Sequence, residues 1–185
     1  MYRFIQTVMA STIFGLLLVC TAHAGDSIPV SDKSACMSGP MSGFGRYIGD
    51  WKIEDSSLSR ETGEWEAGEG AQWNFVCLGG VAVQDFWLPA DGKVGTNLRT
   101  WNADTESWDI AWTVTGMSGF AHIGAKMDAD GNIVMHYKSP IPTPNRRITF
   151  FPPDENNWDW KLEITQDGGE NWIEVYRIRA TRIVQ

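Results

Sequence analysis

Short segments in which apolar and polar residues alternate follow one another along most of the chain, and this pattern constrains the fold more than any other feature. Such alternation is typical of strands with one buried face. No segment shows a 3.6-residue apolar period of helical length, so the sequence predicts an all-β chain and excludes an α/β fold. We expect ten strands, at residues 46–54, 64–78, 81–88, 96–102, 107–115, 120–128, 132–139, 146–151, 158–165 and 172–183.

Turn-forming pairs separate these segments. The Asp-Gly pairs at residues 91–92, 130–131 and 167–168 supply the positive φ angles that tight hairpin turns require. Consecutive strands are therefore expected to be antiparallel neighbours. A meander has two exposed edges unless its first and last strands pair. The sequence thus predicts a single up-and-down antiparallel β-barrel of about ten strands, wide enough for a ligand cavity to be plausible.

The N-terminal region has the features of a secretory signal peptide over residues 1–24. Arg3 supplies the positive start, an apolar stretch covers residues 13–19, and Ala-His-Ala precedes the expected cleavage point. We expect a flexible lead-in at residues 25–45 with one helical turn, followed by the barrel domain at residues 46–185. No stretch approaches the roughly 20 apolar residues that a membrane span needs. The expected product is soluble, and periplasmic or secreted.

The charge of the chain limits its partners. The formal net charge is -8 at pH 7, and Arg146 with Arg147 forms the one basic cluster that stands out. Such a surface repels phosphate backbones. The sequence therefore predicts no nucleic-acid partner.

Two cysteines, Cys36 and Cys77, follow the expected leader. In an oxidising compartment an even number of cysteines favours a disulfide. Cys36 also lies in a polar Ser/Gly/Met segment, where a lone buried thiol has little to pack against. We predict a Cys36–Cys77 disulfide, with two independently buried thiols as the alternative.

The order of several motifs resembles a known group of barrels. Gly49-Asp50-Trp51, entering the first strand, is similar to the Gly-x-Trp opening of lipocalin-like (calycin) barrels, in which the Trp closes one end. The later features are a Trp-Asn-Ala-Asp turn at 101–104 before Trp108, a Gly-rich segment at 116–119, an arginine entering a late strand at Arg147, and a last strand ending at 177–183. Over residues 40–183 these features resemble a family of bacterial, often exported, lipocalin-like proteins of unknown function.

Two further resemblances are narrower. Nitrobindin-like haem barrels and fatty-acid-binding barrels are distantly similar, but the haem barrels carry an axial histidine late in the chain and none follows His136 here. We therefore expect no haem and no other cofactor. Residues 165–172 resemble the Asp-box hairpin of sialidases, in which the aspartate ties down its own turn and the Trp packs beneath it. A propeller would repeat this box, so a folding role is expected for Asp167 and Trp172.

Metal binding needs several His, Cys or carboxylate groups that converge on one point. After the leader the histidines are His122 and His136, on the two arms of one hairpin. They face opposite sides of the sheet if the turn is Asp130-Gly131, and one side if Ala129 belongs to the turn. No metal site is predicted.

For acid/base catalysis the candidates are Asp85 and Glu163, which each interrupt an apolar strand, together with His122. The alternative is that these side chains point away from the barrel interior. No Gly-x-Ser-x-Gly nucleophile motif is present.

For ligand binding the candidates combine aromatic rings with polar anchors. Rings at alternating positions of a strand make an apolar wall, and arginines can hold a carboxylate or phosphate. The alternative is that the tryptophans only fill the core. The candidates are Arg99, Trp101, Trp112, Arg147 and Tyr176.

Three functions fit these features. We favour an exported, non-enzymatic binder or carrier of a small, largely apolar or amphipathic ligand, which can bear a carboxylate. The second is an enzyme, an isomerase or hydrolase, that uses the same cavity and needs a carboxylate or histidine inside. The third is a surface module for carbohydrate or protein, with an exposed row of tryptophans. Alternation shows which residues share a face but not which face is inside, and the oligomeric state stays open.

Overall fold

The computed structural model describes residues 32–184, so the predicted signal peptide and the first part of the lead-in lie outside the described residues. Three short helical segments come first, and an 11-stranded antiparallel sheet follows. The helical segments are η1 (Lys33–Cys36), η2 (Gly39–Met41) and α1 (Ser42–Gly45). The strands are β1 (Gly49–Leu58), β2 (Trp65–Ala67), β3 (Ala71–Leu78), β4 (Ala82–Pro89), β5 (Gly95–Asn102), β6 (Ser107–Val114), β7 (Ala121–Met127), β8 (Ile133–Ser139), β9 (Asn145–Phe150), β10 (Asn157–Thr165) and β11 (Ile173–Arg182).

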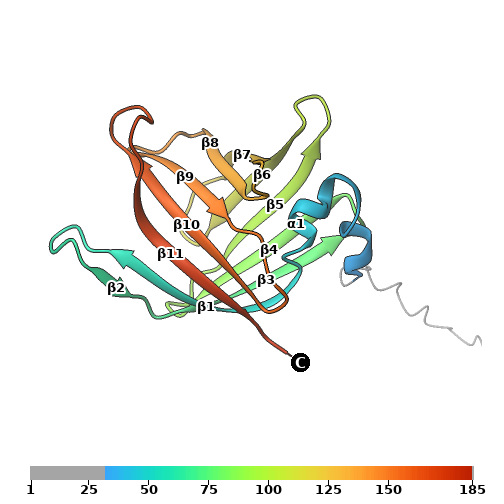
Figure 1. Cartoon of the computed structure of the whole chain (residues 1–185), viewed down its shortest axis with the longest axis horizontal. Coiled ribbons are helices and arrows are strands. Elements are labelled where there is room, and N and C mark those ends of the chain that lie inside the picture. Colours follow the sequence, from blue (N-terminus) through green and yellow to red (C-terminus); the bar gives the residue numbers. More distant parts are fainter. Residues whose placement is uncertain (1–31, 185) are drawn as a thin grey trace, which may run out of the picture.

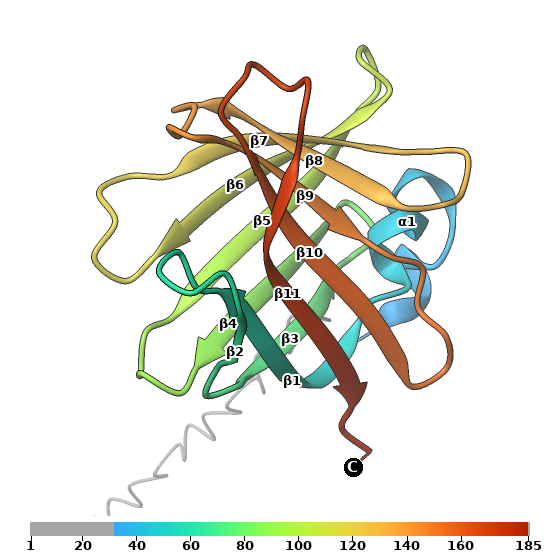
Figure 2. The same cartoon turned by 60° about the vertical axis from the view of Figure 1, so that its left-hand side comes forward.

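The sheet closes into a barrel. Its order is β11-β10-β9-β8-β7-β6-β5-β4-β3-β1-β2, and β11 also pairs with β1. Ten strands therefore form a closed up-and-down ring, and β2 is an addition to β1 outside it (Figures 1 and 2). The predicted all-β, lipocalin-like barrel of about ten strands is confirmed.

The region from residue 64 to residue 78 differs from the single strand that its alternation predicts. It divides into β2 and β3, because the pairing with β1 is interrupted between Ala67 and Ala71 and the register shifts there by one residue, while the chain keeps its direction. The backbone N–H of Gly68 donates to the Asp55 carbonyl oxygen at 2.8 Å, and the backbone N–H of Gly70 donates to the Asp55 carboxylate at 2.9 Å. One half of β1 pairs with β3 and the other with β2. The β1–β2 hairpin consequently projects from one end of the barrel (Figure 1).

The helical segments cover the opposite end of the barrel from this hairpin (Figure 1). Cys36, Met41 and Phe44 are buried in the same apolar cluster as the strand residues. The described part of the predicted flexible lead-in is therefore packed as a plug, because its spaced apolar side chains complete the core. The Cys36–Cys77 disulfide joins this plug to β3, which confirms the predicted pairing.

The plugged end is also where the Gly-x-Trp motif lies. Trp51 is fully buried, and its indole Nε1 donates to the Tyr47 carbonyl oxygen at 2.7 Å. The guanidinium carbon of Arg182 lies 4.0 Å from the centre of the Trp51 ring system. Gly49 has φ of 133°, a backbone conformation that favours glycine, and its Cα lies close beside the Arg182 guanidinium. Trp51 thus closes this end, as the family resemblance implies.

The Asp-box-like segment forms the hairpin between β10 and β11. Asp167 Oδ1 accepts from the Thr165 hydroxyl at 2.7 Å and from the Asn171 amide at 3.0 Å. The Trp172 indole donates to the Gly169 carbonyl oxygen at 3.1 Å. These local bonds agree with the folding role expected for Asp167 and Trp172.

We expect the paired substitution Cys36→Ser with Cys77→Ser to lower the free energy of unfolding by about 4 kcal/mol, the chain-entropy value for a loop of this length. The sequence separation of the two cysteines is 41. Urea unfolding of the oxidised protein and of the double variant measures the difference. The control is the unmodified protein with its disulfide reduced, and its unfolding midpoint should equal that of the variant. Equal midpoints for variant and oxidised protein would contradict the prediction.

Candidate functional site

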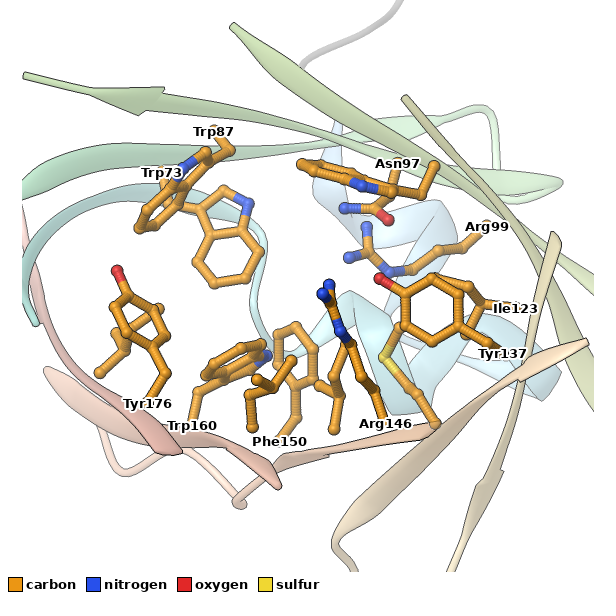
Figure 3. Close-up of a pocket in the computed structure, with 15 residues that line it drawn as sticks. Trp73, Trp87, Asn97, Arg99, Ile123, Tyr137, Arg146, Phe150, Trp160 and Tyr176 are labelled. Atoms are coloured by element: carbon orange, nitrogen blue, oxygen red, sulfur yellow. The ribbon is translucent and has the colours of Figure 1, made fainter. Parts of the chain in front are cut away.

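A cavity of about 320 Å³ lies inside the barrel, toward the end away from the plug. Strand residues near the β4–β5, β6–β7, β8–β9 and β10–β11 hairpins line it (Figure 3). The open end therefore faces these hairpins, whereas the helical segments close the other end. The residues around the cavity are Trp73, Trp87, Asn97, Arg99, Trp112, Ile123, Met135, Tyr137, Arg146, Ile148, Phe150, Trp160, Leu162, Tyr176 and Ile178.

Four tryptophans form much of the wall. Trp73 meets Trp87 edge to face, with ring centroids 5.0 Å apart, and Trp160 meets Tyr176 in the same way at 5.8 Å. Trp112 lies across Gly95, where a Cβ would lie 2.3 Å from its ring. Gly95 therefore leaves room for the Trp112 ring beside the mouth. This wall is apolar and held by ring-to-ring contacts.

Arg99 lies on the inner face of β5 and is fully buried. Its Nη2 donates to Asp85 Oδ2 at 2.5 Å. The guanidinium carbon also lies 4.8 Å from the centre of the Phe44 ring and 5.3 Å from that of Phe75. A carboxylate and aromatic faces thus hold the cation at the floor of the cavity, where Figure 3 shows its guanidinium directed inward.

Asp85 is the inward carboxylate that the sequence left undecided. Its side chain is fully buried beside Arg99. The backbone amide of Asn97 donates to Oδ1 at 3.0 Å, and the side-chain amide of Asn97 lies 3.1 Å from both carboxylate oxygens. Asp85 is therefore saturated by Asn97 and Arg99, and acts as the counter-ion of Arg99.

Several donors around the cavity have no protein acceptor. Arg99 Nε and Nη1 are buried without a hydrogen-bond partner among the described residues, and so are the indole Nε1 atoms of Trp73 and Trp160. A buried donor without an acceptor costs free energy, and such groups in native proteins call for an explanation. The interior consequently offers more donors than the described chain satisfies.

On β9 the arginine that lines the cavity is Arg146, and the prediction that Arg147 does so is wrong. Arg146, Ile148 and Phe150 share the inner face of the strand. Arg147 points outward, because successive side chains alternate across a sheet. Figure 3 shows the Arg146 guanidinium directed into the cavity.

Glu163 also faces outward, so its predicted role inside the barrel is not possible. Its carboxylate accepts from Arg147 Nε at 2.9 Å and Nη2 at 3.0 Å, and from Lys161 Nζ at 3.1 Å. Burial favours a higher pKa for Glu163, but these hydrogen bonds outweigh it and hold the pKa below its usual value. The Arg147 guanidinium also stacks on Trp172 at 4.5 Å. This group therefore stabilises the outer face.

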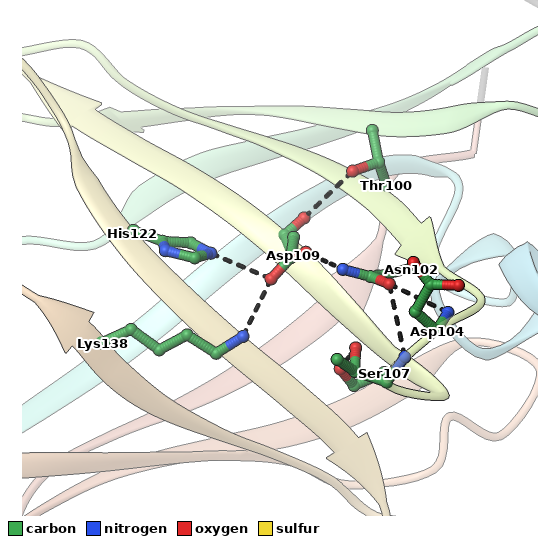
Figure 4. A network of polar contacts seen from close by, with 8 residues as sticks. Thr100, Asn102, Asp104, Ser107, Asp109, His122 and Lys138 are labelled. Carbon is green, nitrogen blue, oxygen red and sulfur yellow. Dashed lines mark hydrogen bonds and ion pairs between the residues drawn. The ribbon is translucent and has the colours of Figure 1, made fainter.

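His122, the third catalytic candidate, lies outside the barrel in a polar network (Figure 4). Its Nε2 is 2.9 Å from Asp109 Oδ1, and Lys138 Nζ donates to the same oxygen at 2.9 Å. Hydrogen bonds from Asn102, Lys138 and His122 hold the pKa of Asp109 well below its usual range. The network lies across the sheet from the cavity, so His122 cannot act on a molecule inside it.

The two histidines follow the register in which Ala129 belongs to the turn. Met127 pairs with Ile133 and Gly124 with His136, whereas a bulge between His122 and Ile123 shifts the register at His122. Both histidines face outward, because their chain neighbours Ile123 and Met135 line the cavity. Burial, together with the charge of Arg147, lowers the pKa of His136. No group of three or more His, Cys, Asp or Glu side chains that could hold a metal is found within residues 32–184.

Of the remaining ligand candidates, Trp112 and Tyr176 line the cavity and Trp101 does not. Trp101 packs edge to face on Trp108, 5.2 Å between centroids, farther along β5 toward the plug. The Tyr176 hydroxyl donates to Asp55 Oδ2 at 2.7 Å. Burial, with the Asp55 carboxylate, raises the pKa of Tyr176 well above its usual value.

The tryptophans do not form the exposed row that a surface-binding module needs. Trp108 and Trp160 are buried. Trp65 and Trp172 lie on the outer face, but each has an arginine stacked on it, Arg177 at 3.5 Å and Arg147 at 4.5 Å.

Comparison with known proteins supports the fold. No protein-family model matches the chain, and no curated protein matches it in sequence. Among solved structures, the S-type phycobiliprotein lyase CPES from Guillardia theta is similar, with a TM-score of 0.54 and 12% identity, over 83% of this chain and 97% of the lyase chain. At this identity the likeness shows the lipocalin-like fold alone. Within the described residues, no helix is long and apolar enough to cross a membrane.

The Asp85–Arg99 pair gives a prediction for stability. We expect Asp85→Asn and Arg99→Met each to cost about 3–5 kcal/mol, because each leaves a buried partner unpaired. The loss of unfolding free energy in the double variant should be smaller than the sum of the two single losses by at least about 2 kcal/mol. Urea unfolding of the four proteins completes the cycle. Purely additive losses would show that the two side chains do not interact.

Proposed function

We propose that the barrel binds a small, largely apolar or amphipathic molecule in its cavity and carries it without converting it. The cavity supports this most directly, because it is open at one end and walled by four tryptophans. Its volume of about 320 Å³ is at the lower end of the range of about 300–1,000 Å³ that is usual for ligand sites. The ligand is therefore compact.

In this proposal the binding residues are close to those expected from the sequence. Arg99, Trp112 and Tyr176 contact the ligand directly, and Trp101 supports the floor from behind. Arg146 takes the position expected for Arg147. No cofactor and no nucleic acid takes part.

An enzyme that uses the same cavity is the alternative, and two observations favour it. One similar solved structure is named a phycobiliprotein lyase, and Asp85 is an inward carboxylate. However, Asn97 and Arg99 occupy its oxygens, and its side chain is fully buried. Asp85 is thus placed to balance a charge and not to move a proton, which favours a carrier over an enzyme.

We also propose that the protein is exported, to the periplasm or beyond the cell. The Cys36–Cys77 disulfide supports this, because disulfides persist mainly in oxidising compartments. A leader that is cleaved after residue 24 would fit the same route.

The binding proposal predicts that filling the cavity abolishes binding. N-phenyl-1-naphthylamine, a small neutral fluorescent probe, should bind the protein at about one molecule per chain. Met135→Trp, on the inner face of β8, should weaken binding by about tenfold or more, because overpacking removes the space. Fluorescence titration measures the affinity, and mass spectrometry of the released probe checks that it is unchanged.

The matched control is Val134→Trp, which adds the same side chain one residue earlier on the outer face of β8, so its affinity should equal that of the unmodified protein. If Met135→Trp does not fold, Leu162→Trp fills the cavity nearer its mouth. Unchanged affinity in a folded cavity-filling variant would show that the probe binds elsewhere and would refute the proposal.

A further inference from the structure

The side chains around the cavity include cations and hydrogen-bond donors but no carboxylate. Its lining includes two guanidinium groups, of Arg99 and Arg146, and no Asp or Glu. Asp85, which neutralises Arg99, lies behind the wall, and Asp55 is engaged by Tyr176 and by the Gly70 amide. The side chains that line the cavity therefore carry positive charge and no negative charge.

At the floor of the cavity, Arg99 has N–H groups that donate to no acceptor among the described residues. Nη2 serves Asp85, whereas Nε and Nη1 have no acceptor among the described residues, although the side chain is fully buried. The rings packed around the guanidinium, including Phe44 and Phe75, offer π faces but no oxygen atoms. An acceptor for these N–H groups must come from outside the described chain, and the cavity is the space beside them.

Two more unpartnered donors lie around the same space. The indole Nε1 atoms of Trp73 and Trp160 are buried without acceptors among residues 32–184. Arg146, which is exposed at the start of β9, adds a second cation nearer the mouth. An occupant rich in acceptors and negatively charged would satisfy these groups.

The apolar part of the wall indicates which shape of ligand fits the cavity. Trp73, Trp87, Trp112, Trp160 and Phe150 surround the space, and their edges and faces suit a planar ring. Chain ends with several free rotations lose more entropy on binding than a rigid ring system does. The size of the cavity, about 320 Å³, also favours a compact molecule.

We infer that the ligand class is a compact aromatic carboxylate, bound with its carboxylate at the floor on Arg99 and its ring between the tryptophans, with Arg146 as a second cation near the mouth. This inference rests on the proposed binding function. It adds the charge, the orientation and the ring character of the ligand.

The first test compares head groups on one ring. By isothermal titration calorimetry at pH 7.5, 2-naphthoate should bind roughly tenfold to hundredfold more tightly than methyl 2-naphthoate, because charge-assisted hydrogen bonds are lost in the ester. The ammonium analogue 2-naphthylmethylamine should not bind measurably. Decanoate, with the same head but a flexible body, should bind more weakly than 2-naphthoate.

The second test locates the carboxylate. The double variant Asp85→Asn with Arg99→Met removes both buried charges together, which avoids leaving one unpaired. It should bind 2-naphthoate no more tightly than the methyl ester, and a near-ultraviolet circular dichroism spectrum that matches that of the unmodified protein should report that the aromatic wall is intact. Arg146→Gln should weaken 2-naphthoate several-fold. Arg147→Gln, the neighbouring arginine on the outer face, is the matched control and should leave the affinity unchanged.

The outcomes separate this inference from the proposed function. Loss of all binding, of N-phenyl-1-naphthylamine as well, would overturn both. If that neutral probe binds but the ester or the amine binds as tightly as 2-naphthoate, the carrier function stands and the inference of an anionic ligand is wrong. Tighter binding of decanoate than of 2-naphthoate would overturn the inference that the ligand has an aromatic ring. An equal effect of Arg147→Gln and Arg146→Gln would overturn the placement of the second cation.

Discussion

The pairing between β1 and β11 places Trp51 opposite Arg182 at one end and Ser57 opposite Tyr176 at the other. These hydrogen bonds join the two ends of the meander, so every barrel strand has a neighbour on both sides. Because the ring is closed, one face of each strand is removed from water. The cavity, the buried ion pair and the aromatic wall all exist only inside that closed ring.

Closure alone would leave a barrel open at both ends, and the plug makes the two ends different. Phe44, brought in by α1, lies against Arg99, and the disulfide fixes the plug to β3. The floor of the cavity is thus built partly from a segment outside the ring of strands. The plug gives the cavity a floor, and the cavity lies toward the other end, near the β4–β5, β6–β7, β8–β9 and β10–β11 hairpins.

The interior combines a charged pair with an apolar wall. Burying Arg99 and Asp85 costs desolvation free energy, and their mutual attraction offsets it only when further hydrogen bonds are made. Asn97 completes those bonds for Asp85, whereas two nitrogen atoms of Arg99 remain without acceptors in the described chain. This imbalance suits a binding site better than a core that only has to be stable. It is the physical basis for proposing a carrier of an anionic ligand.

Alternation and Asp-Gly turns determined the class of fold, the number of barrel strands within the ring and the antiparallel order, because these follow from local backbone preferences. The cysteine count likewise favoured the disulfide over two separately buried thiols, and the tertiary structure confirmed it. Local pattern could not determine which face is inside, since that depends on closure and curvature of the whole sheet. Arg146 and Arg147 illustrate this limit, because both are arginines on one strand and only tertiary structure places Arg146 inside. Tertiary structure likewise decided that Asp85 meets Arg99 within the barrel while Glu163 and His122 lie outside it.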